Sequence, residues 1–346
     1  MSQQSQSVSS RRTFLKAAGL GAGMSAAATI TGCGGGGTQG PGKRLKAAFS
    51  NGGLAGTWCQ LGKQTAELWG ELLNVEIVWK DGEYDDQAQR AKIDLIVDQP
   101  WDFCCIQANQ TGFLAEPVKQ LHKNGVPVIS MDVLLVEKDK LRKTGVWTHV
   151  TPDHVYMAES STQYLMDKIG GKGNVIHIGG YSGHSGAVGR KTGFDNIVAK
   201  YPDVTVVGGD VRWCDWKKEK ARNTFEALLE KADGPVAGAF FHNDDMALAS
   251  QPAIVGTRHE DMIVTSVDGQ KEGLGGVEDG KIHATTVNPA CAIHATSLFL
   301  GVLICRNEEK MEDLPLEIIT PGPLVSKETG NLEAMLYLSD AKHCLV

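Results

Sequence analysis

The sequence lacks most of the patterns that identify enzymes and membrane proteins. Its 346 residues contain no CxxC pair and no HExxH motif, so the usual zinc-site spacings are missing. No strand-associated GxGxxG motif is followed by an acidic residue, which argues against a dinucleotide cofactor. The apolar run at 17–31 has only 15 positions, mostly Ala and Gly, whereas a membrane-spanning helix needs about 20. No later run approaches that length, so we predict no metal, no cofactor and no spanning helix.

Basic and aromatic residues are also scarce. The chain has 34 Lys and Arg against 41 Asp and Glu, a formal net charge of −7, and only 6% aromatic residues. An acidic surface does not attract nucleic acid or anionic lipid, so we expect neither as a partner. The hydrophobic content of 42% and the charged content of 22% are ordinary for a folded chain.

The first 33 residues have the pattern of a bacterial export signal. Residues 10–16 read SRRTFLK, and the apolar run that follows ends in ITGC at 30–33. Paired arginines before a modest apolar run are typical of the twin-arginine route. The small residues before Cys33 match a lipobox, in which the cysteine is lipidated and becomes the mature N-terminus. The Gly-rich residues 34–43 would form a flexible tether.

This interpretation places the chain in the periplasm or at the cell surface, with the lipid as its only membrane link. Removal of residues 1–32, which hold three basic and no acidic residues, would leave 314 residues with a net charge of −10. Two alternatives remain open. The segment could be a membrane anchor, or it could be a twin-arginine signal that is cleaved elsewhere, with Cys33 incidental.

The cysteines do not define a disulfide framework. Seven remain without Cys33, and an odd number cannot all pair within the chain. They are Cys59, Cys104, Cys105, Cys214, Cys291, Cys305 and Cys344. Cys104 and Cys105 are adjacent in an apolar stretch, so we expect them to be small core residues. The compartment permits a disulfide, but the sequence assigns none.

The remaining chain alternates between strand and helix patterns. Strands are expected at 45–50, 75–79, 101–106, 126–130, 174–178, 204–207, 236–241, 263–267 and 282–287. Helices are expected at 61–74, 86–98, 111–124, 186–200 and 291–305, from 215 to 231, after 245, and at 152–169 with Pro152 in the first turn. Near-continuous apolar strands between helices indicate parallel sheets covered on both faces. About ten strands exceed one comfortable sheet, so we predict an α/β fold with two similar lobes.

Polar residues collect where the predicted strands end. Asn51, Asp132, Asn243, Asp268 and Asn288 each follow an apolar strand, and the segment 180–190 follows another. Ligands of open parallel sheets bind at the carboxyl ends of the strands, so two facing lobes would bring these positions to one cleft. Any single one of them could instead be an ordinary turn or cap residue.

The chemistry of this set suits a polyhydroxylated ligand. Asp and Asn accept and donate hydrogen bonds in a geometry that vicinal hydroxyls can meet. Arg190 offers a planar fork for adjacent oxygens. Trp58, Trp213 and Trp216 could stack on the apolar face of a sugar ring, although each could equally be a core or surface residue.

From residue 44 to the end, the chain resembles the periplasmic sugar-binding proteins of ABC transporters, the ribose-binding cluster with the type 1 periplasmic-binding fold. The specific pieces are NDDMAL at 243–248, VDG at 267–269, GKI at 280–282 leading into Asn288, and LVSKE at 324–328. The resemblance implies a hydrogen-bonding pocket at Asn243, Asp268, Arg190 and Asp132, an aromatic at Trp216, and a lobe crossover at Asn288.

The chain departs from this family at three places. The family often has an Asn-Pro-Phe-Trp or Asn-Pro-Phe-Phe sequence after its first strand. Here Asn51 is followed by two glycines and a leucine, with Trp58 as the nearest aromatic. Val133 stands where ribose-type proteins have Arg, and Pro252 interrupts the helix after Asn243. These differences argue against ribose itself and leave the sugar class.

Enzyme interpretations fit the residues less well. The glycine-rich segment 179–190 fails both the spacing and the lysine of a phosphate loop, and it lacks the final glycine of a GxSxG elbow. Asp244 and Asp245 are adjacent and would point apart, unlike a glycosidase pair, and Asp244 is placed to cap a helix. An oxidoreductase exported by the twin-arginine route and a sensory subunit that delivers its sugar to a receptor kinase remain alternatives.

We therefore expect two Rossmann-like, doubly wound parallel-sheet lobes joined by a three-segment hinge. The first lobe would comprise 44–151 plus 289–321, and the second 152–288 plus 322–346. A monosaccharide or polyol would bind between them, without chemical conversion, and a membrane permease would receive it. We expect a monomer. The predicted ligand-binding residues are Asn51, Trp58, Asp132, Arg190, Trp216, Asn243, Asp268 and Asn288.

Overall fold

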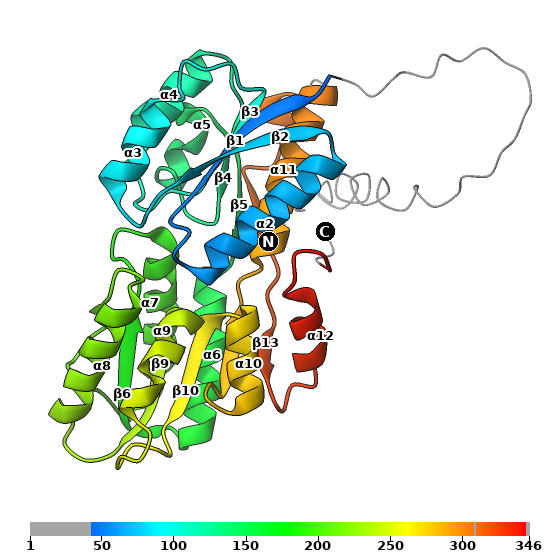
Figure 1. The fold of residues 1–346 in the computed structure, drawn as a ribbon. Helices are drawn as coiled ribbons and strands as arrows, with labels where there is room; N and C mark the ends of the chain where they lie inside the picture. Colours follow the sequence, from blue (N-terminus) through cyan, green and yellow to red (C-terminus); the bar gives the residue numbers. More distant parts are fainter. Residues whose placement is uncertain (1–42, 308, 344–346) are drawn as a thin grey trace, which may run out of the picture. The chain divides into compact units, whose positions relative to one another are not determined.

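The computed structural model describes residues 43–307 and 309–343. The export signal predicted at 1–33, with Cys33, and the tether residues 34–42 lie outside them. From Arg44 onward the described chain forms one compact unit, and this unit contains two lobes, each built on its own β-sheet (Figure 1).

The sheet of the first lobe has six strands in the order β12-β5-β4-β3-β1-β2. All its neighbouring strands are parallel. The strands are β1 (Leu45–Asn51), β2 (Val75–Asp81), β3 (Phe103–Ile106), β4 (Val128–Met131), β5 (Val146–Pro152) and β12 (Glu317–Thr320). Every residue of β3 and β4 is buried, as expected for central strands that are covered on both faces.

Helices cover both faces of this sheet. Apolar residues of α2 (Thr57–Leu72) and α11 (Ala290–Asn307) pack on one face. Those of α3 (Asp86–Asp94), α4 (Ala115–Lys123) and α5 (Leu141–Thr144) pack with a second cluster on the other face. The first lobe is therefore a three-layer α/β arrangement with α11, from late in the chain, beside α2 (Figure 1).

The sheet of the second lobe follows the order β13-β11-β10-β9-β6-β7, with β8 paired to β6. Its strands are β6 (Lys172–Gly179), β7 (Asp203–Val206), β8 (Arg212–Trp213), β9 (Val236–Phe241), β10 (Ile263–Asp268), β11 (Ala284–Val287) and β13 (Leu324–Ser326). Its helices are α6 (His154–Ile169), α7 (Ser185–Val198), α8 (Lys218–Lys231), α9 (Asp244–Ser250), α10 (Lys271–Asp279) and α12 (Leu332–Leu338). Helices α6 and α7 pack on one face, and α8, α9 and α10 on the other.

The chain passes between the sheets three times. It leaves β5 at Pro152 for α6, leaves β11 at Val287 for α11, and leaves β12 at Thr320 for β13. Because Thr320 pairs with Pro152, β5 and β12 end at the same edge of the first sheet. Strand β13 then enters the second sheet from the end at which β11 leaves it, so β13 pairs antiparallel with β11.

The predicted α/β fold with two parallel-sheet lobes is confirmed, with local corrections. Pro152 does not open a helix, because it is the last residue of β5 and the side chain of Asp153 caps α6 by accepting from the Tyr156 N–H. The sequence pattern also missed β5, β8, β12 and the short helix α12. Strand β13 falls in the segment 324–328, which resembles the family's closing strand, but its antiparallel pairing with β11 was not predicted.

The expectation that no later run approaches a spanning length was wrong. Helix α11 has 18 residues with a mean hydropathy of 1.4, long and apolar enough to cross a membrane by composition alone. Its residues Ile293, Leu298 and Val302 are buried in the first lobe's core. A helix that is apolar on all sides is thus used here between a sheet and α2.

Candidate functional site

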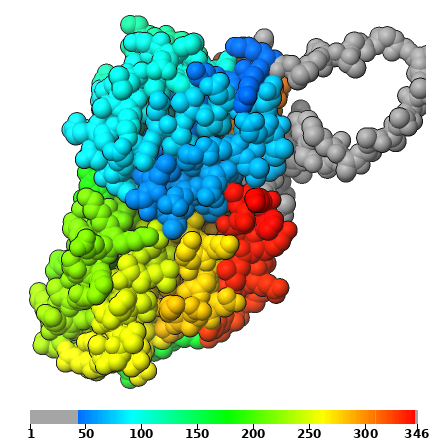
Figure 2. Space-filling model, viewed as in Figure 1, coloured from blue at the N-terminus to red at the C-terminus, as the bar shows by residue number. Residues whose placement is uncertain are grey.

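A cavity of about 40 Å³ lies where the two lobes meet. The blue and cyan surface of the first lobe is in contact with the green and yellow surface of the second (Figure 2). Hydrogen bonds join the lobes around the cavity, from the Thr57 N–H to Asp245 Oδ2 at 3.1 Å and from Tyr181 Oη to Asp86 Oδ2 at 2.9 Å. The lobes are therefore in a closed arrangement.

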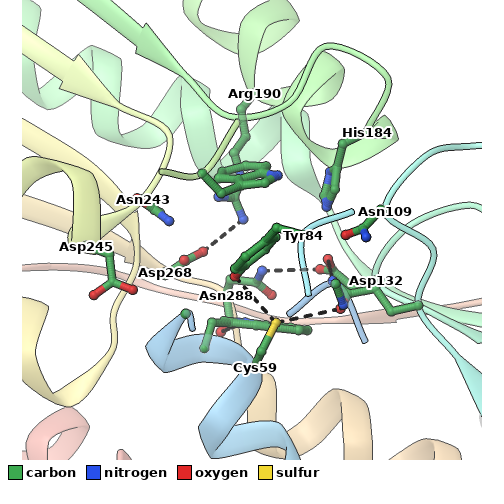
Figure 3. A pocket seen from close by; sticks show the side chains of 15 residues that line it. Cys59, Tyr84, Asn109, Asp132, His184, Arg190, Asn243, Asp245, Asp268 and Asn288 are labelled. Carbon is green, nitrogen blue, oxygen red and sulfur yellow. Dashed lines mark hydrogen bonds and ion pairs between the residues drawn. The ribbon is translucent and has the colours of Figure 1, made fainter. Parts of the chain in front are cut away.

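The cavity wall is mostly polar and comes from both lobes (Figure 3). Seven of the eight predicted residues line it, namely Trp58, Asp132, Arg190, Trp216, Asn243, Asp268 and Asn288. The structure also places Gly52, Gly56, Cys59, Tyr84, Gln107, Asn109, His184 and Asp245 on this wall.

Asn51 is the exception among the predicted residues. Its side chain is buried behind the wall, where the Nδ2 atom donates to the carbonyl of Cys59 at 3.0 Å. Because residues alternate in direction along β1, the last residue of a strand can point into the lobe rather than the cleft. Asn51 therefore ties the start of α2 to β1 and does not face the cavity.

Arg190 and Asp268 form a buried ion pair at the second-lobe side of the cavity. Arg190 Nη2 lies 3.0 Å from Asp268 Oδ1, and Nη1 donates to the carbonyl of His242. The guanidinium lies 5.6 Å from the Trp216 ring centroid. Burial raises the pKa of the Asp268 carboxyl, and the nearby Arg190 charge opposes that shift. Arg190 Nε has no partner among the described residues, so the guanidinium keeps one unused donor.

Asp132 is the corresponding carboxylate of the first lobe. It follows β4 with φ of 55°, and its two oxygens accept from Gln107 Nε2 at 2.7 Å and from Asn288 Nδ2 at 3.2 Å. Burial acts to raise the pKa of this carboxyl. His154, His184 and Arg190, with the Asn288 amide, outweigh burial and lower it. Asp132 is therefore an ionised acceptor at neutral pH.

Two of the wall asparagines, Asn243 and Asn288, each keep one side-chain polar atom free. Asn243 caps α9 through its Oδ1, which accepts from the Met246 N–H at 2.9 Å, so its amide nitrogen is available to a ligand. The Asn288 backbone carbonyl accepts from Trp58 Nε1 at 3.1 Å and its Nδ2 donates to Asp132, whereas its Oδ1 has no partner among the described residues. Both side chains are thus held in place by the protein and can make one further hydrogen bond.

Asp244 does not cap this helix, contrary to the sequence prediction. It is buried and accepts from Ser266 Oγ at 2.5 Å and from Thr285 Oγ1 at 2.7 Å. Burial raises its pKa to about 6. Asp244 therefore joins α9 to β10 and β11, and Asn243 takes the capping position.

The histidine tautomers follow from backbone donors. His184 Nδ1 accepts from the Ala187 N–H at 3.2 Å, so its proton sits on Nε2. Burial lowers the pKa of His184 to about 3, and the ring stays neutral. His242 Nδ1 accepts from the Gly180 N–H at 3.2 Å, so its Nε2–H donates to His177 Nε2 at 2.8 Å. His184 is thus a neutral donor on the cavity wall, beside Asp132 and Asn109 (Figure 3).

Sequence reasoning missed about half of the wall. Gln107 directly follows β3, so the rule that found Asp132 and Asn243 would have found it too. His184 lies within the segment 180–190, but only Arg190 was selected there. Asp245 was considered only as a possible catalytic acid. Tyr84 lies in the turn between β2 and α3 and carries no local signal at all.

The arrangement is suited to hold a neutral polar molecule. Carboxylates, amides, one guanidinium and one neutral imidazole line the cavity together with the aromatic side chains of Trp58, Tyr84 and Trp216. Among residues 43–307 and 309–343, no cluster of three or more His, Cys, Asp or Glu side chains could hold a metal ion. Two sheet lobes with a polar cavity at the ends of their strands define a solute-binding protein of the periplasmic type.

Comparisons with known proteins identify the family. The profile of the periplasmic binding protein domain matches residues 47–308, and the chain belongs to this periplasmic family. It is 26% identical over 267 residues to the xylitol-binding protein of Mycolicibacterium smegmatis, covering 77% of this chain and 73% of the relative. It is also 26% identical over 260 residues to the ribose import binding protein of Bacillus subtilis, covering 75% and 81%. These relatives are solute-binding proteins rather than enzymes.

A solved structure shows the same fold. The periplasmic binding protein of the arabinose ABC transporter from Shewanella sp. ANA-3, bound to L-arabinofuranose, superposes with a TM-score of 0.76 at 21% identity. The superposition covers 86% of this chain and 96% of that chain.

Proposed function

We propose that this protein captures a monosaccharide or a related polyol between its lobes and delivers it to an ABC permease. The observation that carries the proposal is the wall of the closed cavity, where Asp132, Arg190, Asn243, Asp268 and Asn288 converge from two sheets with hydrogen-bonding groups left unused. The xylitol- and ribose-binding relatives support this ligand class.

Ligand entry requires the lobes to separate. A cavity of about 40 Å³ holds only a few water molecules, so a sugar cannot enter the closed arrangement. The hinge would be the three crossings near Pro152, Asn288 and residues 321–323, with lobes at 44–151 plus 289–321 and at 152–288 plus 322–346. Closure on a ligand excludes water and strengthens each polar contact.

We propose further that the chain is a twin-arginine-exported lipoprotein, lipidated at Cys33 and monomeric. The basis is the SRRTFLK sequence at 10–16, the small residues before Cys33 and the Gly-rich tether. Palmitate labelling of the full chain tests this directly. We expect label in the wild type, none in Cys33→Ala, and retention in the cytoplasm when Arg11 and Arg12 are both replaced with Lys. Label in Cys33→Ala would exclude this site.

A thermal-shift screen tests the binding proposal. The panel is erythritol, xylitol, sorbitol, D-ribose, L-arabinose, D-galactose and myo-inositol, followed by calorimetry of each compound that stabilises the protein. At a concentration about 100-fold above Kd, a binder adds about 2.7 kcal/mol to the unfolding free energy, which is a measurable rise in melting temperature. If no member of the panel raises the melting temperature, the sugar and polyol class is excluded.

A further inference from the structure

The side chain of Tyr84 lies in the middle of the cavity residues, between Cys59 and Arg190 (Figure 3). It comes from the turn between β2 and α3, and its hydroxyl lies 3.7 Å from Cys59 Sγ. Its ring lines the cavity together with Trp216 of the second lobe. Tyr84 is thus, with Trp58 of α2, one of two first-lobe aromatic side chains on the cavity wall.

Two glycines, Gly53 and Gly56, make room for this side chain, and Gly52 makes room for its neighbour Asn109. A Cβ atom on Gly53 would lie 2.7 Å from Tyr84 Cδ2, and one on Gly56 would lie 2.1 Å from Tyr84 Oη. A Cβ on Gly52 would meet Tyr84 Cε1 at 3.4 Å and Asn109 Oδ1 at 2.9 Å. Contacts below 3.0 Å are not tolerated without movement, so the loop after β1 can accept Tyr84 only because it lacks side chains.

The backbone of Tyr84 is held in an unfavourable conformation. Glu83 and Tyr84 have φ of 55° and 49°, in the left-handed region that residues with a Cβ rarely adopt. The Tyr84 N–H donates to the Gly52 carbonyl at 2.8 Å, and the Gly82 N–H donates to the Asn51 carbonyl at 3.1 Å. Such strain persists where the surroundings over-determine it, and it gathers at ligand sites.

From this cradle, formed by Gly53 and Gly56, we propose that Tyr84 determines which ligands the cleft accepts. Its ring sets the depth of the first-lobe side and limits the site to small polyols and monosaccharides, with Trp216 as the opposite wall. This inference rests on the proposed function, because it specifies the ligand of the same cleft. It assigns the size limit to one side chain held in place by the neighbouring loop.

The test compares calorimetric affinities for erythritol, xylitol and sorbitol, linear polyols of increasing chain length. We expect Tyr84→Ala to improve the affinity for sorbitol relative to xylitol about tenfold, the usual effect of one carbon unit in a tight pocket. Tyr84→Phe should keep the wild-type order, since the ring remains. Trp216→Ala, from the opposite wall, should weaken all binders without preference for length.

A second pair of variants tests the cradle itself. Gly56→Ala should displace the ring and weaken xylitol binding about tenfold, which is about 1.4 kcal/mol. The double variant Gly56→Ala/Tyr84→Phe should recover affinity to near that of Tyr84→Phe, because the atom closest to the new methyl group is the hydroxyl oxygen. Circular dichroism melting of each unliganded variant establishes that it folds.

The possible outcomes separate this inference from the proposed function. If the wild type binds panel members and Tyr84→Ala changes none of the affinities, or lowers all of them equally, Tyr84 is not the size filter and the inference fails alone. If the double variant does not regain the xylitol affinity that Gly56→Ala loses, the packing of Tyr84 against the glycine loop does not determine binding. If the wild type binds no member of the panel, the proposed function fails and the inference fails with it.

Discussion

The two lobes build their sides of the cavity by different means. In the second lobe, Arg190 lies within α7, Asn243 caps α9 and Asp268 ends β10, and each is bonded to its own lobe. In the first lobe, Gly52, Gly56, Tyr84 and Asn109 come from connecting loops. These second-lobe groups are thus fixed by regular structure, whereas more of the first-lobe side, apart from Trp58 and Cys59 of α2, comes from loops packed against each other.

This difference suggests a division of roles. A group bonded within its own lobe keeps its geometry whether the cleft is open or closed, so it can supply affinity with little reorganisation. A loop can change its side chains without disturbing the sheet behind it. We therefore expect affinity to depend mainly on the second lobe and ligand size to depend mainly on the first.

The largest expected effect is acid sensitivity, and it should be greater in the second lobe, where burial also lowers the pKa of two further histidines, His154 and His242. Burial lowers the pKa of His177 and His184 to about 3, and that of His149 and His294 in the first lobe to about 4, from the ordinary 6.5. As pH falls below 6.5, these histidines become protonated in the unfolded chain but stay neutral in the folded chain. The unfolding free energy should then fall by about 1.4 kcal/mol per pH unit for each such histidine.

Asp244 and Asp268 act in the opposite direction, because burial raises the pKa of both carboxyls. The folded pKa of Asp244 is about 6, so between pH 6 and 3.8 the folded state binds this proton before the unfolded state does. Urea denaturation from pH 7 to 4 measures the net change, and hydrogen exchange assigns it to a lobe. His177→Gln should reduce the loss, whereas replacing the exposed His122 should not. If both lobes lose stability equally in acid, the expectation that the second lobe is more sensitive than the first is wrong.

The next effect concerns ligand affinity. Arg190→Ala leaves the buried Asp268 carboxylate without its cation, so we expect binding of the best panel compound to weaken by about 2–4 kcal/mol. Arg190→Lys keeps the charge without the planar fork and should give an intermediate value. Calorimetry measures both, with melting temperatures to confirm folding. Unchanged affinity in a folded Arg190→Ala variant would remove Arg190 from the site.

The smallest effect tests a contact between the lobes. Helix α2 has no capping side chain of its own and no acid in its first turn, and Asp245 of the second lobe accepts from the Thr57 N–H and hydroxyl at 3.1 and 3.2 Å. Asp245→Ala should therefore cost about 0.5–1 kcal/mol of ligand affinity, the usual value of a cap. The reduced closure should also appear as a larger radius in small-angle scattering.

Lys218→Ala provides the matched control. It removes the ion pair with Asp245 Oδ1 at 3.0 Å but leaves the helix cap intact. Because half of the Lys218 side chain is exposed, this pair should contribute little. If both substitutions have the same effect, the change comes from the Lys218–Asp245 ion pair within the second lobe, and the contact of Asp245 with Thr57 contributes nothing measurable.

Sequence patterns predicted the second-lobe side of the site better than the first. Asn243 and Asp268 follow apolar strands whose period and length are visible in the sequence, and both line the cavity. The rule that a polar residue at a strand end faces the cleft also selected Asn51, whose side chain points into the lobe. The rule fails there because the end of a strand does not specify which face of the sheet its last side chain takes. Tyr84 could not be found, since its position depends on glycines 28 or more residues away.

The order of apolar strands, amphipathic helices and polar strand ends determined the α/β class, the two sheets and most of the residues at their carboxyl edges. These features depend on local periodicity, which the chain carries in every short window. Only the tertiary structure decided that Tyr84 fills the first-lobe wall, that the apolar helix α11 lies in the first lobe's core, and that Asp245 caps a helix 188 residues earlier. Such contacts depend on how distant segments pack, and no local pattern records which segments will be neighbours.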